Sequence, residues 1–307
     1  MQTILITGGT GMIGTAMRQA LVLQGYRVII LTRNPAAGKQ EEGVTYARWD
    51  VEKQEADEQA IAAADHIIHL AGAGVADKRW TATRKAEIVQ SRTRSTQLLA
   101  DILRRIPNKV KSFVSASATG WYGADPTVPN PNPFTEDAPA ENSFLGNTCR
   151  EWEAASDAIA AAGLRTVKLR IGVVLSPAGG LQKAFTQPMK WGIAAILGGG
   201  RQMISWIHVH DLVQLFIKAT TDENMQGAYN AVAPNPVDHR SLVLMLARSR
   251  QRFFIPVPVP GFMVRLIAGE LSTEVLKSAT VSAAKTVATG FAFRYPVLTP
   301  ELFGKAG

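Results

Sequence analysis

Three glycines spaced three residues apart carry the clearest chemical signal in this chain. Gly8, Gly11 and Gly14 lie in the run TGGTGMIG, between a short apolar segment and an amphipathic one. The first glycine permits a tight turn, the second lets the backbone approach a pyrophosphate, and the third lets a helix pack closely on a sheet. Free N–H groups at the start of that helix attract phosphate. The run predicts a dinucleotide site with contacts at Gly8, Thr10, Gly11, Met12, Ile13 and Gly14.

The end of the next predicted strand, Arg27–Leu31, indicates which dinucleotide is bound. NAD sites usually carry an acid about 20 residues after the glycines, where it binds the ribose 2′-hydroxyl. This chain has Arg33 there, and no acid occurs between residues 25 and 40. A guanidinium binds a 2′-phosphate through charge-assisted hydrogen bonds, and Lys39 is a second cation nearby. We therefore expect NADP(H); the alternative is that Arg33 only covers the adenine face.

Two later strand ends provide further candidate contacts. Asp50 follows a predicted strand at Val44–Trp49, where its carboxylate is suited to the adenine amino group; a helix N-cap is the alternative role. Leu70, Ala71 and Gly72 end the strand at His66–Leu70. In a parallel sheet this edge lies beside the adenosine ribose and the pyrophosphate.

The elements that must position these residues alternate between strand and helix. Apolar runs predict strands, and segments with helical spacing separate most of them. Such alternation indicates an α/β fold, a Rossmann-type doubly wound parallel sheet covered on both faces. The predicted strands are 2–7, 27–31, 44–49, 66–70, 110–115 and 165–169, and the predicted helices are 14–24, 56–64, 83–105 and 147–162.

The pattern weakens after about residue 175, where glycines break the chain into loops and short helices. We expect a dinucleotide-binding Rossmann domain at 1–232, in which 176–210 contributes to the substrate side. A smaller C-terminal domain at 233–307 supplies the rest of the substrate side, which is therefore discontinuous in the sequence. The proline-rich stretch at 126–139 is expected to be a long binding loop at the substrate end.

Composition excludes several classes of protein. The chain has 307 residues, 33 Lys and Arg against 25 Asp and Glu, and a net charge of +8. The basic residues are scattered, which argues against nucleic-acid binding and favours the approach of anionic ligands. One cysteine, Cys149, excludes an intramolecular disulfide framework. No apolar run approaches the roughly 20 residues of a membrane span, and no signal peptide is recognisable, so a cytoplasmic location is expected. His208 and His210 lack a third ligand, so no metal is expected.

Several motifs resemble the extended short-chain dehydrogenases/reductases of the sugar-nucleotide-epimerase type. The segment 115–119 with Tyr122 and Gly123 resembles that family's serine segment, and 207–211 (IHVHD) resembles its late IHV-x-D element. The segments 69–74 and 290–296 are similar to the YfcH-like branch of epimerase-family proteins. The resemblance covers nearly the whole chain. It implies NADP as cofactor, with contacts at the positions of Thr32, Arg33, Leu70, Ala71, Glu87, Arg92 and Val174.

From the residues alone, Glu87 and Arg92 are polar positions on the helix 83–105, and an exposed face is an equal alternative.

The larger family catalyses with Ser, Tyr and Lys, the last two in a Tyr-x-x-x-Lys pattern. Here Leu145 and Cys149 stand at the Tyr and Lys positions, and neither can hold the proton or the charge. Ser117 and Tyr122 remain as catalytic candidates. The alternatives are a Ser117 bonded to backbone and a Tyr122 that packs at the cleft mouth.

The sequence thus indicates an NADP(H)-binding oxidoreductase or nucleotide-sugar epimerase with an atypical active site that lacks the Tyr-x-x-x-Lys pair. The alternative is a non-catalytic NADP(H)-binding regulator or scaffold. The expected partners are a small-molecule substrate, for which a nucleotide sugar is one candidate, and a second copy of the chain; no nucleic acid or membrane partner is expected.

Overall fold

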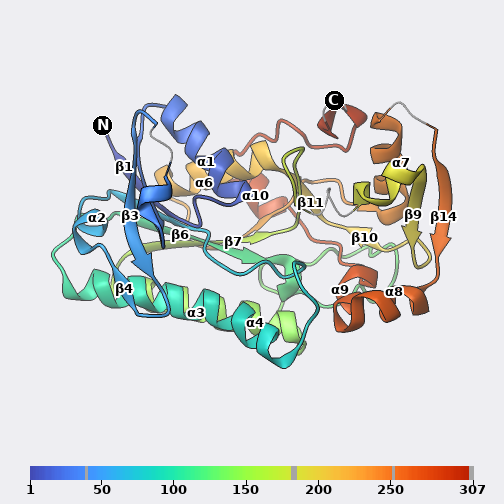
Figure 1. The fold of residues 1–307 in the computed structure, drawn as a ribbon, viewed down its shortest axis with the longest axis horizontal. Helices are drawn as coiled ribbons and strands as arrows, with labels where there is room; N and C mark the ends of the chain where they lie inside the picture. The colour runs from blue at the N-terminus through green and yellow to red at the C-terminus, as the bar shows by residue number, and fades with distance from the viewer. Residues whose placement is uncertain (39–40, 181–184, 251–252, 304–307) are drawn as a thin grey trace.

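The computed structural model describes residues 1–38, 41–180, 185–250 and 253–303. An eight-stranded sheet with the order β12-β7-β6-β5-β1-β2-β3-β4 forms its centre (Figure 1). Seven strands pair in parallel, and the short β4 (Glu55–Ala56) pairs antiparallel with β3. The predicted Rossmann-type parallel sheet is confirmed. The parallel strands are β1 (Thr3–Thr7), β2 (Arg27–Thr32), β3 (Val44–Asp50), β5 (His66–His69), β6 (Ser112–Ala118), β7 (Arg165–Ile171) and β12 (Gly227–Ala231).

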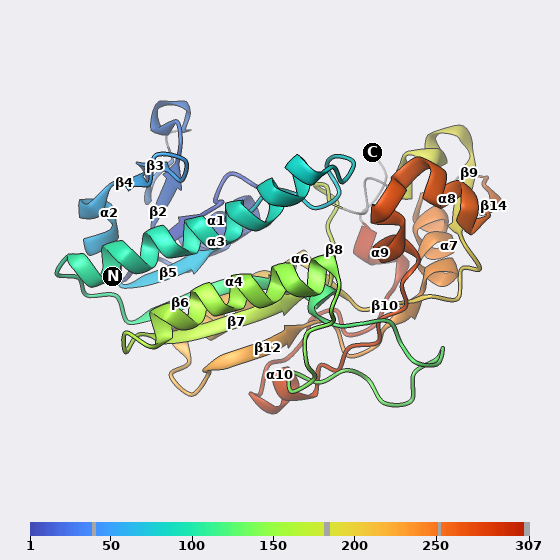
Figure 2. The same cartoon turned by 90° about the horizontal axis from the view of Figure 1, so that it is seen from below.

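Helices cover both faces of the sheet (Figure 2). Helices α1 (Met12–Leu23) and α6 (Val209–Thr221) lie on one face, and α2 (Glu58–Ala62), α3 (Ala82–Arg105) and α4 (Phe144–Ala160) lie on the other. Successive residues of a strand point to opposite faces, so Ile4 and Ile6 pack in the α1–α6 core and Leu5 packs in the α2–α3 core. Burial on both faces explains the continuous apolar run of β1.

The chain after β7 adds three two-stranded sheets beside this core (Figure 1). β8 (Val173–Leu175) pairs with β11 (Trp206–His208), β9 (Ile193–Leu197) with β14 (Ile255–Val259), and β10 (Met203–Ile204) with β13 (Val237–Asp238). Among the described strands β14 pairs only with β9, and such an edge position tolerates its alternating prolines, which cannot donate backbone hydrogen bonds. The helices here are α7 (His239–Ser249), α8 (Gly261–Ala268), α9 (Ser272–Leu276) and α10 (Ala284–Ala288), and the short 3-10 helices of the chain are η1 (Pro35–Ala37), η2 (Thr119–Trp121), η3 (Pro188–Trp191), η4 (Gly269–Leu271) and η5 (Pro300–Phe303).

The proline-rich stretch 126–139 packs against the C-terminal region instead of forming a binding loop. The backbone N–H of Phe134 donates to Thr280 O, and Ser282 N donates to Phe134 O, both at 2.8 Å. Just before the stretch, the Asp125 carboxylate accepts hydrogen bonds from Ser278 and Thr280. These bonds tie the segment to residues 278–282, so the expectation of a binding loop is not supported.

Candidate functional site

The glycine loop has the geometry that its sequence predicts. Gly8 has φ +68°, and a Cβ there would lie 2.8 Å from the carbonyl carbon of Leu70. A Cβ on Gly14 would lie 2.3 Å from Gly8 O. Gly11 is the N-cap of α1, and no side chain caps that helix start. The first N–H groups of α1 are therefore open to an anion, which is what a pyrophosphate requires.

Predicted cofactor contacts from distant segments meet around this loop. The hydroxyl of Thr7 accepts hydrogen bonds from Leu70 N and Ala71 N, each at 3.2 Å, and holds the end of β5 against the end of β1. A Cβ placed on Gly180 would lie 3.2 Å from Met12 Sδ and 3.6 Å from Val174 O, so Met12 and Val174 are close to each other. The segments of Leu70–Ala71 and Val174 are thereby brought to the start of α1.

A buried histidine supports the same strand ends. His69 Nδ1 lies 2.7 Å from Thr7 Oγ1, and its Nε2 lies 3.1 Å from the hydroxyls of Ser95 and Thr96 on α3. Burial, with a smaller effect of the Arg92 charge, lowers the pKa of His69 to about 3. The ring is therefore neutral at physiological pH, and it joins β1, β5 and α3 beneath the predicted cofactor.

The adenine end of the predicted site is exposed. Within the described chain, the Arg33 side chain has no hydrogen-bond or ion-pair partner, and it stands just after β2. Lys39 lies outside the described residues. Asp50 Oδ1 accepts from Glu52 N and Lys53 N, so its Oδ2 is left for an adenine amino group. The N-cap alternative for Asp50 is wrong, because Asp57 caps α2.

Arg92 and Glu87 have different environments although both belong to α3. Glu87 is exposed and pairs with Arg84 at 2.7 Å, in agreement with the exposed-face alternative. Arg92 is only 9% exposed, donates to Ala73 O and Ile88 O, and lies over the Trp152 ring. The exposed-face alternative is therefore wrong for Arg92. No carboxylate in the described parts of the chain pairs with this buried guanidinium.

A cavity of about 360 Å³ adjoins Arg92. It lies beyond the carboxyl ends of β6 and β7, where open α/β sheets bind their ligands. Its walls include residues 118–120, residues 171–173, one side of α4 and residues 271–279 from the C-terminal region. Both parts of the chain therefore contribute to this candidate substrate site.

The two positions that replace the Tyr-x-x-x-Lys pair both line the cavity. Leu145 and Cys149 lie one turn apart on α4 and face it. Cys149 Sγ donates to Ala118 O at 3.6 Å. Burial, reinforced by Glu153, raises the pKa of this thiol to about 12. The thiol therefore stays protonated, and this pair of positions supplies neither a phenol nor a positive charge.

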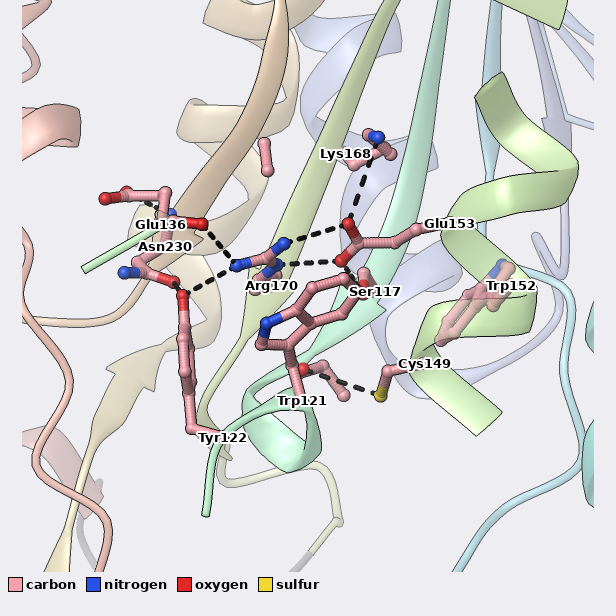
Figure 3. Close-up of polar contacts among 12 residues, drawn as sticks. Ser117, Trp121, Tyr122, Glu136, Cys149, Trp152, Glu153, Lys168, Arg170 and Asn230 are labelled. Carbon is pink, nitrogen blue, oxygen red and sulfur yellow. Dashed lines mark hydrogen bonds and ion pairs between the residues drawn. The ribbon is translucent and has the colours of Figure 1, made fainter. Parts of the chain in front are cut away.

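The structure does not support the catalytic prediction for Ser117 and Tyr122. Neither residue lines the cavity, and both belong to a buried polar network (Figure 3). Ser117 Oγ donates its hydrogen bond to Glu153 at 2.7 Å. The alternative, in which this hydroxyl bonds the backbone, is therefore wrong as well. Tyr122 is fully buried and donates to Asn230 Oδ1 at 2.6 Å, so it does not pack at the cleft mouth either. Both hydroxyls point into the protein because charged partners there satisfy them.

Arg170 on β7 is the centre of that network. Its guanidinium makes two hydrogen bonds to the Glu153 carboxylate, at 2.8 and 3.1 Å, and one to the Tyr122 hydroxyl at 3.0 Å (Figure 3). Burial raises the pKa of Tyr122 to about 12, although Arg170 opposes the shift. Burial disfavours the Arg170 charge, but the Glu153 carboxylate outweighs it and raises the pKa of Arg170. The network thus holds a neutral phenol and an ion pair.

The cavity has polar side chains that sequence reasoning missed. Thr119 lines it, and its hydroxyl has no partner among the described residues. Lys277 Nζ, also on the wall, donates to Tyr122 O at 3.0 Å and lies 2.7 Å from Glu274. Thr119 stood within the recognised serine segment, but no motif marks Lys277. Only the contacts of Lys277 and Ser278 with Tyr122 and Asp125 place that ammonium at the cavity.

The two neighbouring histidines have structural positions. His208 is the N-cap of α6 and accepts from His210 N at 3.2 Å. In the described ranges of the chain, no group of three or more His, Cys, Asp or Glu residues is arranged to hold a metal ion. No described helix is both long and apolar enough to span a bilayer.

Known proteins match nearly the full chain. The model of the NAD dependent epimerase/dehydratase family matches residues 4–231, and a domain of unknown function, DUF1731, matches 259–302. The epimerase family protein YfhF of Bacillus subtilis is 35% identical over 95% of this chain and 94% of its own length.

Two solved structures extend the match. The human epimerase family protein SDR39U1, solved with NADPH, is 28% identical, with a TM-score of 0.82 over 99% of both chains. A nucleoside-diphosphate sugar epimerase from Corynebacterium glutamicum is also 28% identical, with a TM-score of 0.73 over 96% of this chain and 56% of its own. The chain belongs to the NAD dependent epimerase/dehydratase family.

Proposed function

We propose that this protein is an NADP(H)-dependent oxidoreductase that acts on a carbonyl or hydroxyl group held in the cavity beside Arg92. The observation that carries the proposal is Arg33, which follows β2 and has no side-chain partner among the described residues, together with the uncapped start of α1. The human relative that was solved with NADPH supports the choice of the phosphorylated dinucleotide.

The residues present fit such a cofactor. Gly8 and Gly14 allow the tight turn and the close packing of α1, and Gly11 leaves the helix start open to a pyrophosphate. Arg33 has no partner in the described part of the chain, so it can bind a 2′-phosphate. Arg92 lines the cavity, and Val174 follows the lining residue Val173, so both are suited to contact a cofactor that extends into it. When bound, a nicotinamide dinucleotide supplies a hydride for reduction or accepts one in oxidation.

The cavity side chains would handle the substrate oxygen and its proton. The Thr119 hydroxyl can donate a hydrogen bond to a carbonyl oxygen. Lys277 keeps an ammonium hydrogen for a further acceptor, because its third neighbour, Glu141, is 3.8 Å away. Leu145 and Cys149 can only exclude water there. A proton donor from the C-terminal region would explain how the chain dispenses with the Tyr-x-x-x-Lys pair.

Dinucleotide titrations of Arg33→Ala test the cofactor half of the proposal. Each charge-assisted hydrogen bond to the 2′-phosphate is worth about 1.5–3 kcal/mol, so NADPH affinity should fall at least about tenfold while NADH affinity stays unchanged. The matched control is Arg27→Ala, which removes the same charge from the exposed, opposite end of β2. An equal loss for both dinucleotides would refute the assignment.

Single-turnover oxidation of bound NADPH by a panel of carbonyl compounds tests the catalytic half. Oxidation that depends on the added compound supports an oxidoreductase. Tight NADPH binding without turnover of any compound would favour the alternative, a non-catalytic NADP(H)-binding regulator, for which the loss of the Tyr-x-x-x-Lys pair is the supporting observation. The second copy of the chain and the cytoplasmic location stay predictions.

A further inference from the structure

The wall of the cavity beside Arg92 is mostly apolar. It carries aliphatic side chains from α4, from the segment after β7, from β10 and from the C-terminal region. These six face the same space: Leu145, Ile171, Val173, Met203, Ile204 and Val275. A substrate hydroxyl placed against such a wall loses its water without gaining a hydrogen bond, at a cost of about 1–3 kcal/mol each. The wall therefore disfavours a molecule covered with hydroxyl groups.

The cationic side chains at the cavity make hydrogen bonds within the protein, although Arg92 has no carboxylate partner among the described residues. Lys277 is neutralised by Glu274 at 2.7 Å, and both line the wall. Arg92 donates to two backbone carbonyls at the cofactor side of the cavity. His239, also on the wall, is 1% exposed, and burial lowers its pKa to about 4, so its ring is neutral. Within the described wall no uncommitted pair of cations is available for a diphosphate, whose burial requires paired charges.

The size of the cavity sets a further limit. Its volume of about 360 Å³ is at the lower end of the roughly 300–1,000 Å³ that small-molecule sites span. Val173, the neighbour of the predicted cofactor contact Val174, also lines the wall. A bound cofactor would therefore occupy part of the cavity. What remains suits one or two rings or a short chain, so most of a nucleotide sugar would have to lie outside the cavity.

We infer that the substrate is a compact, uncharged and mainly apolar carbonyl compound, or the corresponding alcohol, whose oxygen lies at Thr119 and Lys277. These two side chains form a polar end of a mostly apolar cavity, so they orient one oxygen while the apolar body packs against α4 and residues 271–279. A nucleotide sugar does not fit this combination of wall, charge and volume. The inference rests on the proposed function for its chemistry, but the wall that carries it can be tested by binding alone.

Calorimetric titration of the full chain, with and without NADP⁺, provides that test. The uncharged panel is benzaldehyde, acetophenone, 2-tetralone, 4-phenyl-2-butanone and decanal, and the charged panel is UDP-glucose, UDP-glucuronic acid and dTDP-glucose. We expect at least one uncharged carbonyl to bind at a single site more tightly than every nucleotide sugar. Tighter binding of a nucleotide sugar, or no binding of any uncharged carbonyl, would overturn the inference.

A charged side chain introduced on the wall tests whether the uncharged carbonyl binds in this cavity. Leu145→Asp adds a carboxylate in the first turn of α4, where the helix dipole favours it, so the fold should tolerate the change. Affinity for the uncharged carbonyl should fall at least about tenfold, or 1.4 kcal/mol. Asn142→Asp is the control, since it adds the same charge at an exposed position beside the same helix start. Equal effects of the two variants would contradict the assignment.

The two proposals can fail separately in these experiments. If NADPH does not bind but the uncharged carbonyl does, and Leu145→Asp weakens it, the proposed function falls and the character of the cavity stands. If NADPH binds and a nucleotide sugar is preferred, the cofactor assignment stands and the substrate class is wrong.

Discussion

Replacing Tyr122 by phenylalanine separates a structural role from a catalytic one. The phenol donates to Asn230 Oδ1 at 2.6 Å and accepts from Arg170 Nη1 at 3.0 Å, with no exposed surface. Its loss removes one neutral hydrogen bond, worth about 0.5–1.5 kcal/mol, and one to a charged group, worth about 1.5–3 kcal/mol. Arg170 Nη1 keeps its bond to Glu136 O at 2.9 Å, but one Nη1 hydrogen loses its acceptor and Asn230 Oδ1 loses its donor. The expected destabilisation is therefore about 2–4 kcal/mol.

That loss is measurable by chemical and thermal unfolding. At about 2–4 °C per kcal/mol for a chain of 150–250 residues, and somewhat less for this longer one, Tm should fall by roughly 4–10 °C. NADPH affinity, and kcat with the carbonyl compound that the panel identifies, should stay unchanged at temperatures well below the Tm of the variant. Because burial raises the pKa of the phenol to about 12, Tyr122 stays protonated and does not release its proton near neutral pH.

The matched control is Tyr229→Phe. Tyr229 is 6% exposed, and its hydroxyl has no hydrogen-bond partner in the described part of the chain, so its removal should cost little. A Tyr122→Phe protein with unchanged Tm and a kcat lowered about a hundredfold, as for the loss of a general acid, would refute this reasoning and restore a catalytic Tyr122.

Four further perturbations follow from the site. Glu153→Gln leaves the buried Arg170 without its carboxylate and should cost about 3–5 kcal/mol in denaturant unfolding. Gly14→Ala forces a Cβ to within 2.3 Å of Gly8 O, and dinucleotide titration should show affinity reduced at least about tenfold. Lys277→Met should lower kcat about a hundredfold with unchanged NADPH affinity, and Lys277→Arg should recover part of it. Stability should depend on pH through His69, because its pKa is depressed to about 3 in the folded chain. Its contribution to stability is complete above about pH 6.5. Between about pH 6.5 and pH 3 the contribution decreases by about 1.4 kcal/mol for each unit by which the pH falls. Unfolding curves at pH 7 and pH 5 measure it, and identical stabilities would contradict the buried neutral ring.

The sequence alone determined the fold class and the cofactor loop. Both depend on local information: the apolar runs set the strands, and Gly8, Gly11 and Gly14 fix the turn between β1 and α1 through sterics of their own neighbourhood. The same holds for Arg33, because its place relative to the loop follows from one strand–helix–strand unit. The positions of Leu145 and Cys149 were also predictable, since four residues span one turn of α4.

Only the tertiary structure decided what the polar side chains do. Ser117 and Tyr122 stand in a motif typical of catalysis, but partners far along the chain hold both hydroxyls in the core. Arg170 donates to Tyr122 from 48 residues away, and Glu153 accepts from Ser117 from 36 residues away. Lys277 lies at the cavity although it follows its hydrogen-bond partner Tyr122 by 155 residues in the sequence, and no local pattern encodes that contact. Side-chain direction and cavity polarity result from long-range packing and from the pairing of buried charges, whereas strand and turn signals are complete within a few residues.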